Sequence, residues 1–167
     1  MFQSKKQKIT SHIVFCVYFA LLVWLVVFKF ATSPSQLPSI QSINLIPYYY
    51  AFNTIAHLKQ VIYNIIVFVP LGVYIQIFKN EWKIITKCAA VFLTSFLFEA
   101  VQYIFAIGVS DITDIIDNTA GGIIGIIIFV IIRKIAPKKY ISIFNTLGIL
   151  VEITAIGMLA LLLIANG

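Results

Sequence analysis

The acidic and amide side chains that could take part in chemistry are concentrated in one apolar run of this sequence and in the segment that follows it. Glu99 lies inside the apolar run Ile84–Ile107, and an acidic, amide-containing stretch, Ser110–Asn118, follows it. An ionisable group at membrane depth costs at least about 2.5–3.5 kcal/mol on insertion scales, so such groups usually face partners or a functional site. In that setting, carboxylates and amides would recognise a polar or cationic group, or would act as a general acid–base.

The composition predicts a membrane protein. Of the 167 residues, 61% are hydrophobic and 11% are charged. Five apolar runs of roughly 18–24 residues are long enough to cross about 30 Å of hydrocarbon. They are Ile13–Ala31, Val61–Phe78, Cys88–Ile107, Ile115–Ile132 and Ile141–Ile164. We therefore predict an all-α, polytopic membrane helix bundle in which residues 1–167 form a single transmembrane domain, the first run being a retained anchor.

The basic residues predict the orientation of the chain. Although the net charge is +6, ten of the twelve Lys and Arg residues fall in segments that lie on one side of the membrane if the N-terminus is inside. Only Lys29 and Lys59 fall on the other side. This positive-inside bias predicts an inside N-terminus and an outside C-terminus. We expect membrane lipids, and no nucleic acid, as partners of the basic residues.

Glu99 shares one helical face with other polar residues. At about 100° per residue, a helix through this segment places Cys88, Phe92, Ser95, Glu99 and Gln102 in one stripe. Because this helix runs outward in the predicted orientation, Glu99 and Gln102 should lie in the outer half of the membrane.

The next apolar run has a polar face of its own. Asp114, Asp117, Asn118, Gly121 and Gly125 fall in a second stripe. Glycines four residues apart permit two helices to approach closely. The acidic side chains that precede these glycines are therefore expected to be held against a neighbouring helix.

The predicted topology brings polar residues of three segments to one depth, in the outer half of the membrane. The candidate ligand-binding residues are Asn64, Glu99, Gln102, Asp111, Asp114 and Asn118, with Asp117 beside them. The aromatic residues Tyr48–Tyr50 are expected either to cover this site or to anchor their loop at the membrane surface. A purely architectural role also stays open, because Asp114 and Asp117 begin a helix, where the helix dipole favours negative charge.

The remaining ionisable residues give no sign of a second binding site or of a metal site. Glu152 lies in the last run, nearer mid-membrane, where we expect a protonated structural carboxyl. Carboxylates and amides can bind Mg²⁺ or Ca²⁺, but no loop of ligands at fixed spacing is present. His12 and His57 fall on opposite sides of the predicted membrane. We therefore predict neither a metal nor a cofactor.

Four short motifs follow one another through the middle half of the chain. They are Asn44-Leu-Ile-Pro47, Asn64-x-x-x-Phe68-x-Pro70-Leu-Gly72, Glu99-x-x-Gln102 and Asp111-x-x-Asp114-x-x-x-Asn118-Thr-x-Gly121. Together they resemble the VanZ-like family of bacterial membrane proteins. The resemblance implies a VanZ-like core of about residues 44–135 and an extra C-terminal span at 141–164. Where many relatives carry a second adjacent acid, this chain has Thr113, and it adds Asp117.

The resemblance also implies a multi-pass protein of the bacterial cytoplasmic membrane. The founding member of the family is associated with resistance to the glycopeptide teicoplanin, so an antibiotic-resistance role in the cell envelope is implied. Our leading hypothesis is a protein that binds a lipid-linked cell-wall precursor or a lipoglycopeptide in an outward-facing polar pocket. Two alternatives stay open: a small membrane enzyme acting on a lipid headgroup with Glu99 as acid–base, which we favour less, and a lipid transporter, which would need to oligomerise.

Overall fold

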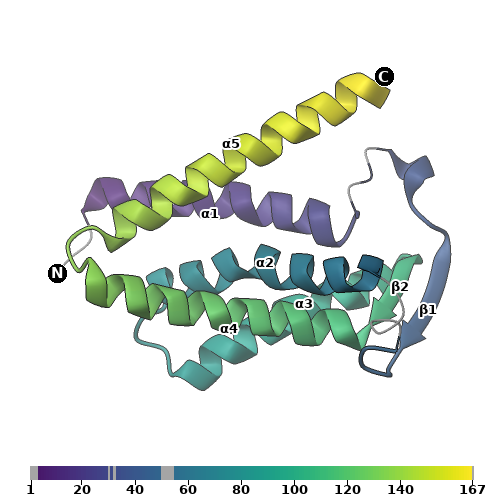
Figure 1. Ribbon diagram of the computed structural model, residues 1–167, viewed down its shortest axis with the longest axis horizontal. Helices are drawn as coiled ribbons and strands as arrows, with labels where there is room; N and C mark the ends of the chain where they lie inside the picture. Colours follow the sequence, from purple (N-terminus) through teal and green to yellow (C-terminus); the bar gives the residue numbers. More distant parts are fainter. Residues whose placement is uncertain (1–3, 30, 32, 50–54, 167) are drawn as a thin grey trace.

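Long helices dominate the part of the chain that the computed structural model describes, residues 4–29, 31, 33–49 and 55–166. In chain order, the elements are α1 (Lys5–Val26), η1 (Pro34–Gln36), β1 (Ile40–Asn44), α2 (Ile55–Phe78), α3 (Ile84–Ile104), β2 (Ile107–Asp111), α4 (Ile112–Ile135) and α5 (Tyr140–Asn166). Five of these helices are long and apolar enough to cross a membrane (Figure 1). The predicted all-α helix bundle is confirmed.

The first helix starts and ends earlier than the predicted span Ile13–Ala31. Ser4 and Gln7 form a capping box, in which each side chain accepts a hydrogen bond from the backbone N–H of the other at 3.1 Å. This cap draws the basic residues that follow Ser4 into the helix. The helix ends at Val26, and Lys29 adopts a left-handed backbone conformation with a φ of 47° that turns the chain away.

Backbone-to-backbone packing joins α2 and α4. A Cβ atom at Gly121 would overlap the carbonyl oxygen of Ile65, and one at Gly125 would overlap the carbonyl oxygen of Val69. Each glycine therefore lies directly over a carbonyl of α2, one helical turn apart. The G-x-x-x-G spacing predicted a close approach of this kind, which sets the middle of α4 against the middle of α2.

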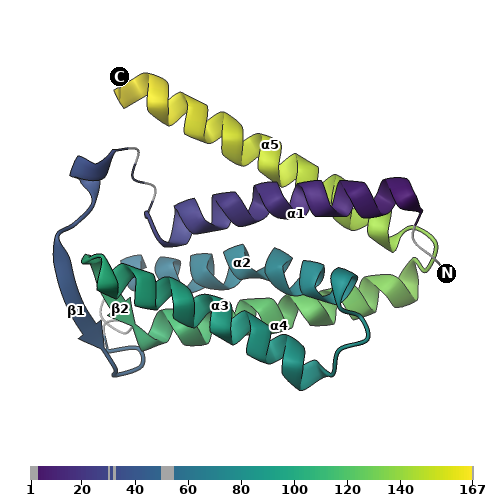
Figure 2. The ribbon, with the colours of Figure 1, turned by 180° about the vertical axis from the view of Figure 1, so that it is seen from behind.

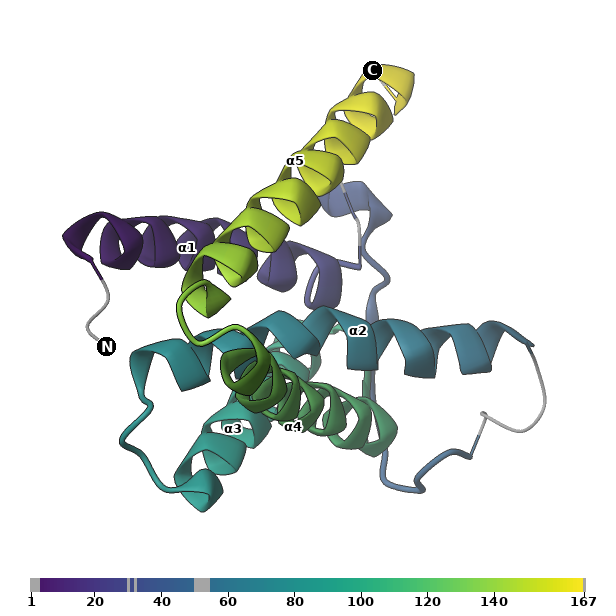
Figure 3. The ribbon, with the colours of Figure 1, turned by 60° about the vertical axis from the view of Figure 1, so that its left-hand side comes forward.

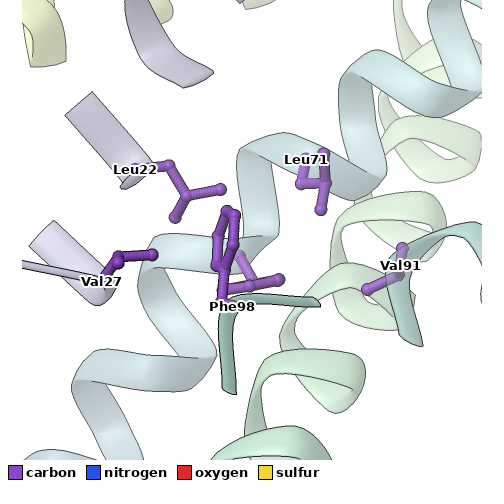
Figure 4. Packing of buried hydrophobic residues seen from close by; sticks show 6 residues of the cluster. Leu22, Val27, Leu71, Val91 and Phe98 are labelled. Atoms are coloured by element: carbon purple, nitrogen blue, oxygen red, sulfur yellow. The ribbon is translucent and has the colours of Figure 1, made fainter. Parts of the chain in front are cut away.

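An apolar cluster ties α1 to α2 and α3. Its buried members are Leu22, Val27, Phe68, Leu71, Val91 and Phe98, and Figure 4 shows how those from the three helices converge. The rings of Phe68 and Phe98 meet edge to face, with their centroids 6.1 Å apart.

The buried face of α3 matches the predicted stripe only in its second half. Ser95, Glu99 and Gln102 are buried, as expected. In the first half, Val91 is buried and Phe92 is exposed, contrary to the prediction. The reason is packing: the Val91 side chain lies against Gly122 of α4, where a larger residue than glycine would not fit.

Two short strands, which were not predicted, run across one end of the bundle. β1 and β2 pair in parallel with the register Ile40↔Ile107 to Asn44↔Asp111. Ala106, with a φ of 53°, turns the end of α3 directly into β2. Figure 2 shows the strands beside the ends of α2, α3 and α4. We call this end, where α1 and α3 finish and α2 and α4 begin, the polar end.

The last helix leaves the bundle. The first half of α5 packs near α1, whereas its second half diverges from the other helices (Figures 1 and 3). At Gly148 an added Cβ would meet Val14 of α1 at 2.6 Å and the Tyr74 hydroxyl at 2.9 Å, whereas at Gly157 nothing lies within 4 Å. Helix α5 thus diverges from the other helices, and we call the space between α5 and the bundle the wedge.

Candidate functional site

Asp111 joins the strand pair to the start of α4. Its Oδ2 accepts a hydrogen bond from the Asn44 side chain at 3.0 Å, across the β1–β2 register. Its Oδ1 accepts from the backbone N–H of Thr113 at 2.8 Å and so caps α4. The backbone N–H of Asp111 donates to Oε2 of Glu99 at 2.9 Å. Asp111 is thereby held by residues of β1, α3 and α4.

Asp114 faces α2 one residue after this cap region. Its Oδ1 accepts hydrogen bonds from the side chains of Asn64 at 2.7 Å and Gln60 at 3.1 Å. The carboxylate is buried in the first turn of α4, where the helix dipole favours negative charge. The predicted meeting of Asn64 with the acids of α4 is observed, and Gln60 is an additional member that the sequence reading missed.

Tyr48 closes this region from the loop after β1. Its backbone N–H donates to Thr113 Oγ1 at 2.9 Å, and its hydroxyl donates to Asp117 Oδ1 at 3.0 Å. Burial, together with the Asp117 carboxylate, raises the pKa of the Tyr48 phenol above its ordinary value of 10.0. Of the predicted aromatic cover, Tyr48 and Tyr49 are seen, and Tyr50 lies outside the described residues.

A buried polar layer lies beneath these residues. The Gln102 amide donates to the carbonyl oxygen of Val26 at 2.8 Å, and the Asn118 amide donates to Ser95 Oγ at 2.9 Å. Glu99, Gln102 and Asn118 are each at most 2% exposed. Side chains of α3 and α4 and the carbonyl end of α1 therefore meet in this layer.

The same layer holds oxygen atoms with unused hydrogen-bonding capacity. Among the described residues, no donor reaches Glu99 Oε1, Gln102 Oε1, Asn118 Oδ1 or Asp117 Oδ2. All four are acceptors. A buried acceptor left alone costs about 1–3 kcal/mol. None of these four residues lines the cavity described next, so their unused capacity lies within the helix packing.

A cavity of about 690 Å³ lies at the polar end. Of the six predicted site residues, two line it, Asp111 and Asp114. The other four do not line it: Asn64, Glu99, Gln102 and Asn118. The lining residues are Lys29, Ser42, Ile43, Asn44, Ile46, Tyr48, Tyr49, His57, Gln60, Val61, Val109, Asp111, Thr113 and Asp114. The cavity is therefore acidic on the α4 side and partly apolar on the loop side.

Lys29 lines the cavity, although the sequence predicted only its side of the membrane and no place in the site. Its ammonium group acts electrostatically on both Glu99 and Asp114. Lys29 and Tyr48 both line the cavity and both have a left-handed backbone, with φ values of 47° and 56°. A non-glycine residue held there costs about 1–2 kcal/mol, and such strain clusters at functional sites.

Charge is unevenly shared at the polar end. Four carboxyl groups lie there, on Glu99, Asp111, Asp114 and Asp117. Lys29 brings an ammonium group to the cavity, and the exposed Lys59 lies near the start of α2. Within the described ranges, no three His, Cys, Asp or Glu side chains are grouped to hold a metal ion. The arrangement suits a ligand that brings its own positive charge and hydrogen-bond donors.

Known proteins place this chain in a family. The family model described as VanZ/LLP1 matches residues 15–133, which run from the middle of α1 nearly to the end of α4 and include all four sequence motifs. The chain is 34% identical over 146 residues to Protein VanZ of Enterococcus faecium, a match that covers 86% of this chain and 88% of that protein. No solved structure matches significantly. The predicted resemblance is confirmed, and the chain belongs to the VanZ/LLP1 family of membrane proteins.

Proposed function

We propose that this protein binds the cationic headgroup of an amphipathic molecule in the cavity at the polar end. The observation that carries the proposal is the cavity itself, of about 690 Å³, with Asp111 and Asp114 in its wall. This volume falls within the range of about 300–1,000 Å³ usual for small-molecule sites. The candidate ligands are a lipid-linked cell-wall precursor and a lipoglycopeptide.

The rim of the cavity supports an amphipathic ligand. Ile43, Ile46 and Tyr49 line the cavity and are exposed. Leu45 beside them is also exposed. Exposed apolar and aromatic residues at the end of a membrane helix bundle suit the headgroup region. With the predicted inside N-terminus, this rim lies in the outer leaflet, and a ligand could place apolar groups on the rim and its charged group inside.

The position of Glu99 favours binding over the enzyme alternative. A general acid–base must come within hydrogen-bonding reach of the group it protonates. Glu99 is 2% exposed, does not line the cavity and holds the backbone of Asp111. In the proposed function Glu99 and Asn64 are positioning residues, and Asp111 and Asp114 supply the charge that meets the ligand.

Lipid-resolved mass spectrometry of gently extracted protein tests the proposal. Asp114→Asn removes the charge but keeps an acceptor for Asn64, and Glu81→Gln removes an exposed acid at the opposite end as the matched control. We expect an amine-bearing component to co-purify with the wild type and with Glu81→Gln, and to fall by at least about 10-fold in Asp114→Asn, since charged hydrogen bonds contribute about 1.5–3 kcal/mol. Identical profiles in all three proteins would contradict the proposal.

The link to glycopeptide resistance has a separate test. The family resemblance suggests a role in glycopeptide resistance, and we propose that ligand binding at this cavity underlies that role. Expression of the wild type should raise teicoplanin tolerance in a susceptible host, and Asp114→Asn should return it to the empty-vector value. Equal tolerance in wild type and variant would contradict the link.

A further inference from the structure

A second cavity lies in the wedge between α5 and the bundle, away from the polar end. It measures about 200 Å³. Its walls come from α1, α2, α4 and α5, through Tyr18, Val69, Pro70, Val73, Tyr74, Ile128, Phe144, Leu147, Gly148, Val151 and Glu152. None of these residues lines the cavity described above. The wall is apolar apart from two tyrosines and one acid.

The acid and one of the tyrosines each carry a buried atom without a partner. Glu152 is 8% exposed and Tyr74 is 2% exposed. Among the residues described, no hydrogen-bond partner reaches Glu152 Oε1 or the Tyr74 hydroxyl. The two groups lie close enough to interact electrostatically. Both line the same cavity, so a polar group bound there has two buried partners available to it.

Glu152 requires either a proton or a cation. A lone carboxylate at membrane depth costs at least about 2.5–3.5 kcal/mol on insertion scales. The cavity wall brings no Lys, Arg or His side chain to it. A proton would remove the charge, and the site would then have no preference for an amine over an alcohol. An ammonium group provides up to three donors and a charge for the carboxylate.

The wedge gives such a group a route from the bilayer. Beyond Glu152, α5 diverges from the other helices (Figures 1 and 3), and its residues Ile153 and Leu161 are exposed. Hydrocarbon chains are what surrounds a membrane helix at this depth. The apolar walls formed by Val69, Phe144 and their neighbours can receive such a chain.

We propose that this wedge is a second binding site, which takes a single-chain amphiphile with a primary ammonium group. The chain lies against α2, α4 and α5, and the ammonium group donates hydrogen bonds to Glu152 and Tyr74. The site stands on residues separate from Asp111 and Asp114, so it does not depend on the function proposed for the polar end.

Native mass spectrometry of the full chain in a non-ionic detergent tests the site with three probes of equal chain length: dodecylamine, dodecanol and dodecanoate. We expect the wild type to retain the amine at least about 10-fold more tightly than the alcohol, as a charged hydrogen bond implies, and to retain the carboxylate least. Glu152→Gln should remove the preference for the amine.

Two further variants keep the test decisive if Glu152→Gln fails to fold. Val151 and Ile153 are equally exposed, at 62% and 63%, but only Val151 lines the cavity. Val151→Trp should lower amine retention several-fold, and Ile153→Trp should leave it unchanged. Equal retention of amine and alcohol by the wild type, a preference that survives Glu152→Gln, or equal effects of the two tryptophans would overturn the proposal.

Discussion

The close contact between α2 and α4 predicts that a single added methyl group will destabilise the protein. Gly121 lies over the carbonyl oxygen of Ile65, next to Asn64. Gly121→Ala places a Cβ on that oxygen. A backbone carbonyl in a helix cannot rotate away, so α4 must move off α2. The movement also separates Asn64 from Asp114. In the wild type, Nδ2 of Asn64 and Oδ1 of Asp114 lie 2.7 Å apart.

Two opposing terms set the size of the effect. An extra methylene in a close-packed interior costs about 1–3 kcal/mol, and the upper part of that range applies because the overlapped atom belongs to the backbone. Alanine favours a helix over glycine by about 1 kcal/mol. We therefore expect Gly121→Ala to lower the free energy of unfolding by about 2 kcal/mol.

Gly157 provides the matched control. Nothing lies within 4 Å of a Cβ built there, so Gly157→Ala should be neutral or should stabilise by up to about 1 kcal/mol. Reversible unfolding in mixed micelles, followed by far-UV circular dichroism, measures both variants. If Gly121→Ala is as stable as the wild type while Gly157→Ala behaves as expected, α2 and α4 are not packed backbone on backbone and the reasoning is refuted.

Further predictions concern the buried layer, the loop and the orientation. Ser95→Ala removes the 2.9 Å partner of a buried amide on α4 and should cost about 1–2 kcal/mol of unfolding free energy, whereas Thr94→Ala, which removes a hydroxyl bonded within its own helix, should cost much less. The pKa of Tyr48 is raised on folding, so the stability from its protonated phenol is full below pH 10.0 and is lost as the pH rises through the raised value. Tyr48→Phe should therefore flatten the fall in melting temperature above pH 10.0, and an unchanged profile would contradict this. In intact cells, a membrane-impermeant thiol reagent should label Gln36→Cys and spare Lys83→Cys; labelling of the second would exclude an outward-facing cavity.

The helices were predictable because their signals are local. Twenty apolar residues and a glycine spacing act over a few turns of one segment, so the five spans and the close approach of Gly121 to a neighbouring helix could be inferred. The depth of Glu99 and Asp114 then followed from counting residues along each helix. Their convergence with Asn64 required only that α2 and α4 begin, and α3 end, on the same side of the membrane.

The strand pair could not be inferred in the same way. The segment Ile40–Asn44 alternates weakly and holds few β-branched residues, and its partner lies in a parallel register more than sixty residues away. Without the strands, Asn44 had no reason to meet Asp111. The cavity wall formed by Lys29 and Asn44 was missed for this reason.

The role of Glu99 was also beyond the sequence. Its depth indicated a functional acid, and the structure places it outside the lining of the cavity, where it holds the Asp111 backbone. Only the packing of α3 against α4, which is set by Val91 on Gly122, decides between these two roles.

Thiol cross-linking tests the central claim most directly, namely that polar side chains of separate helices meet at the polar end. In a background of Cys16→Ser and Cys88→Ser, cysteines replace Asn64 and Asp114, whose side chains lie 2.7 Å apart. A short bifunctional thiol reagent should join this pair within one chain, and should fail when Ile66, exposed on α2, replaces Asn64 as the cysteine site. Equal yields for the two pairs, or a cross-link only through position 66, would contradict the account.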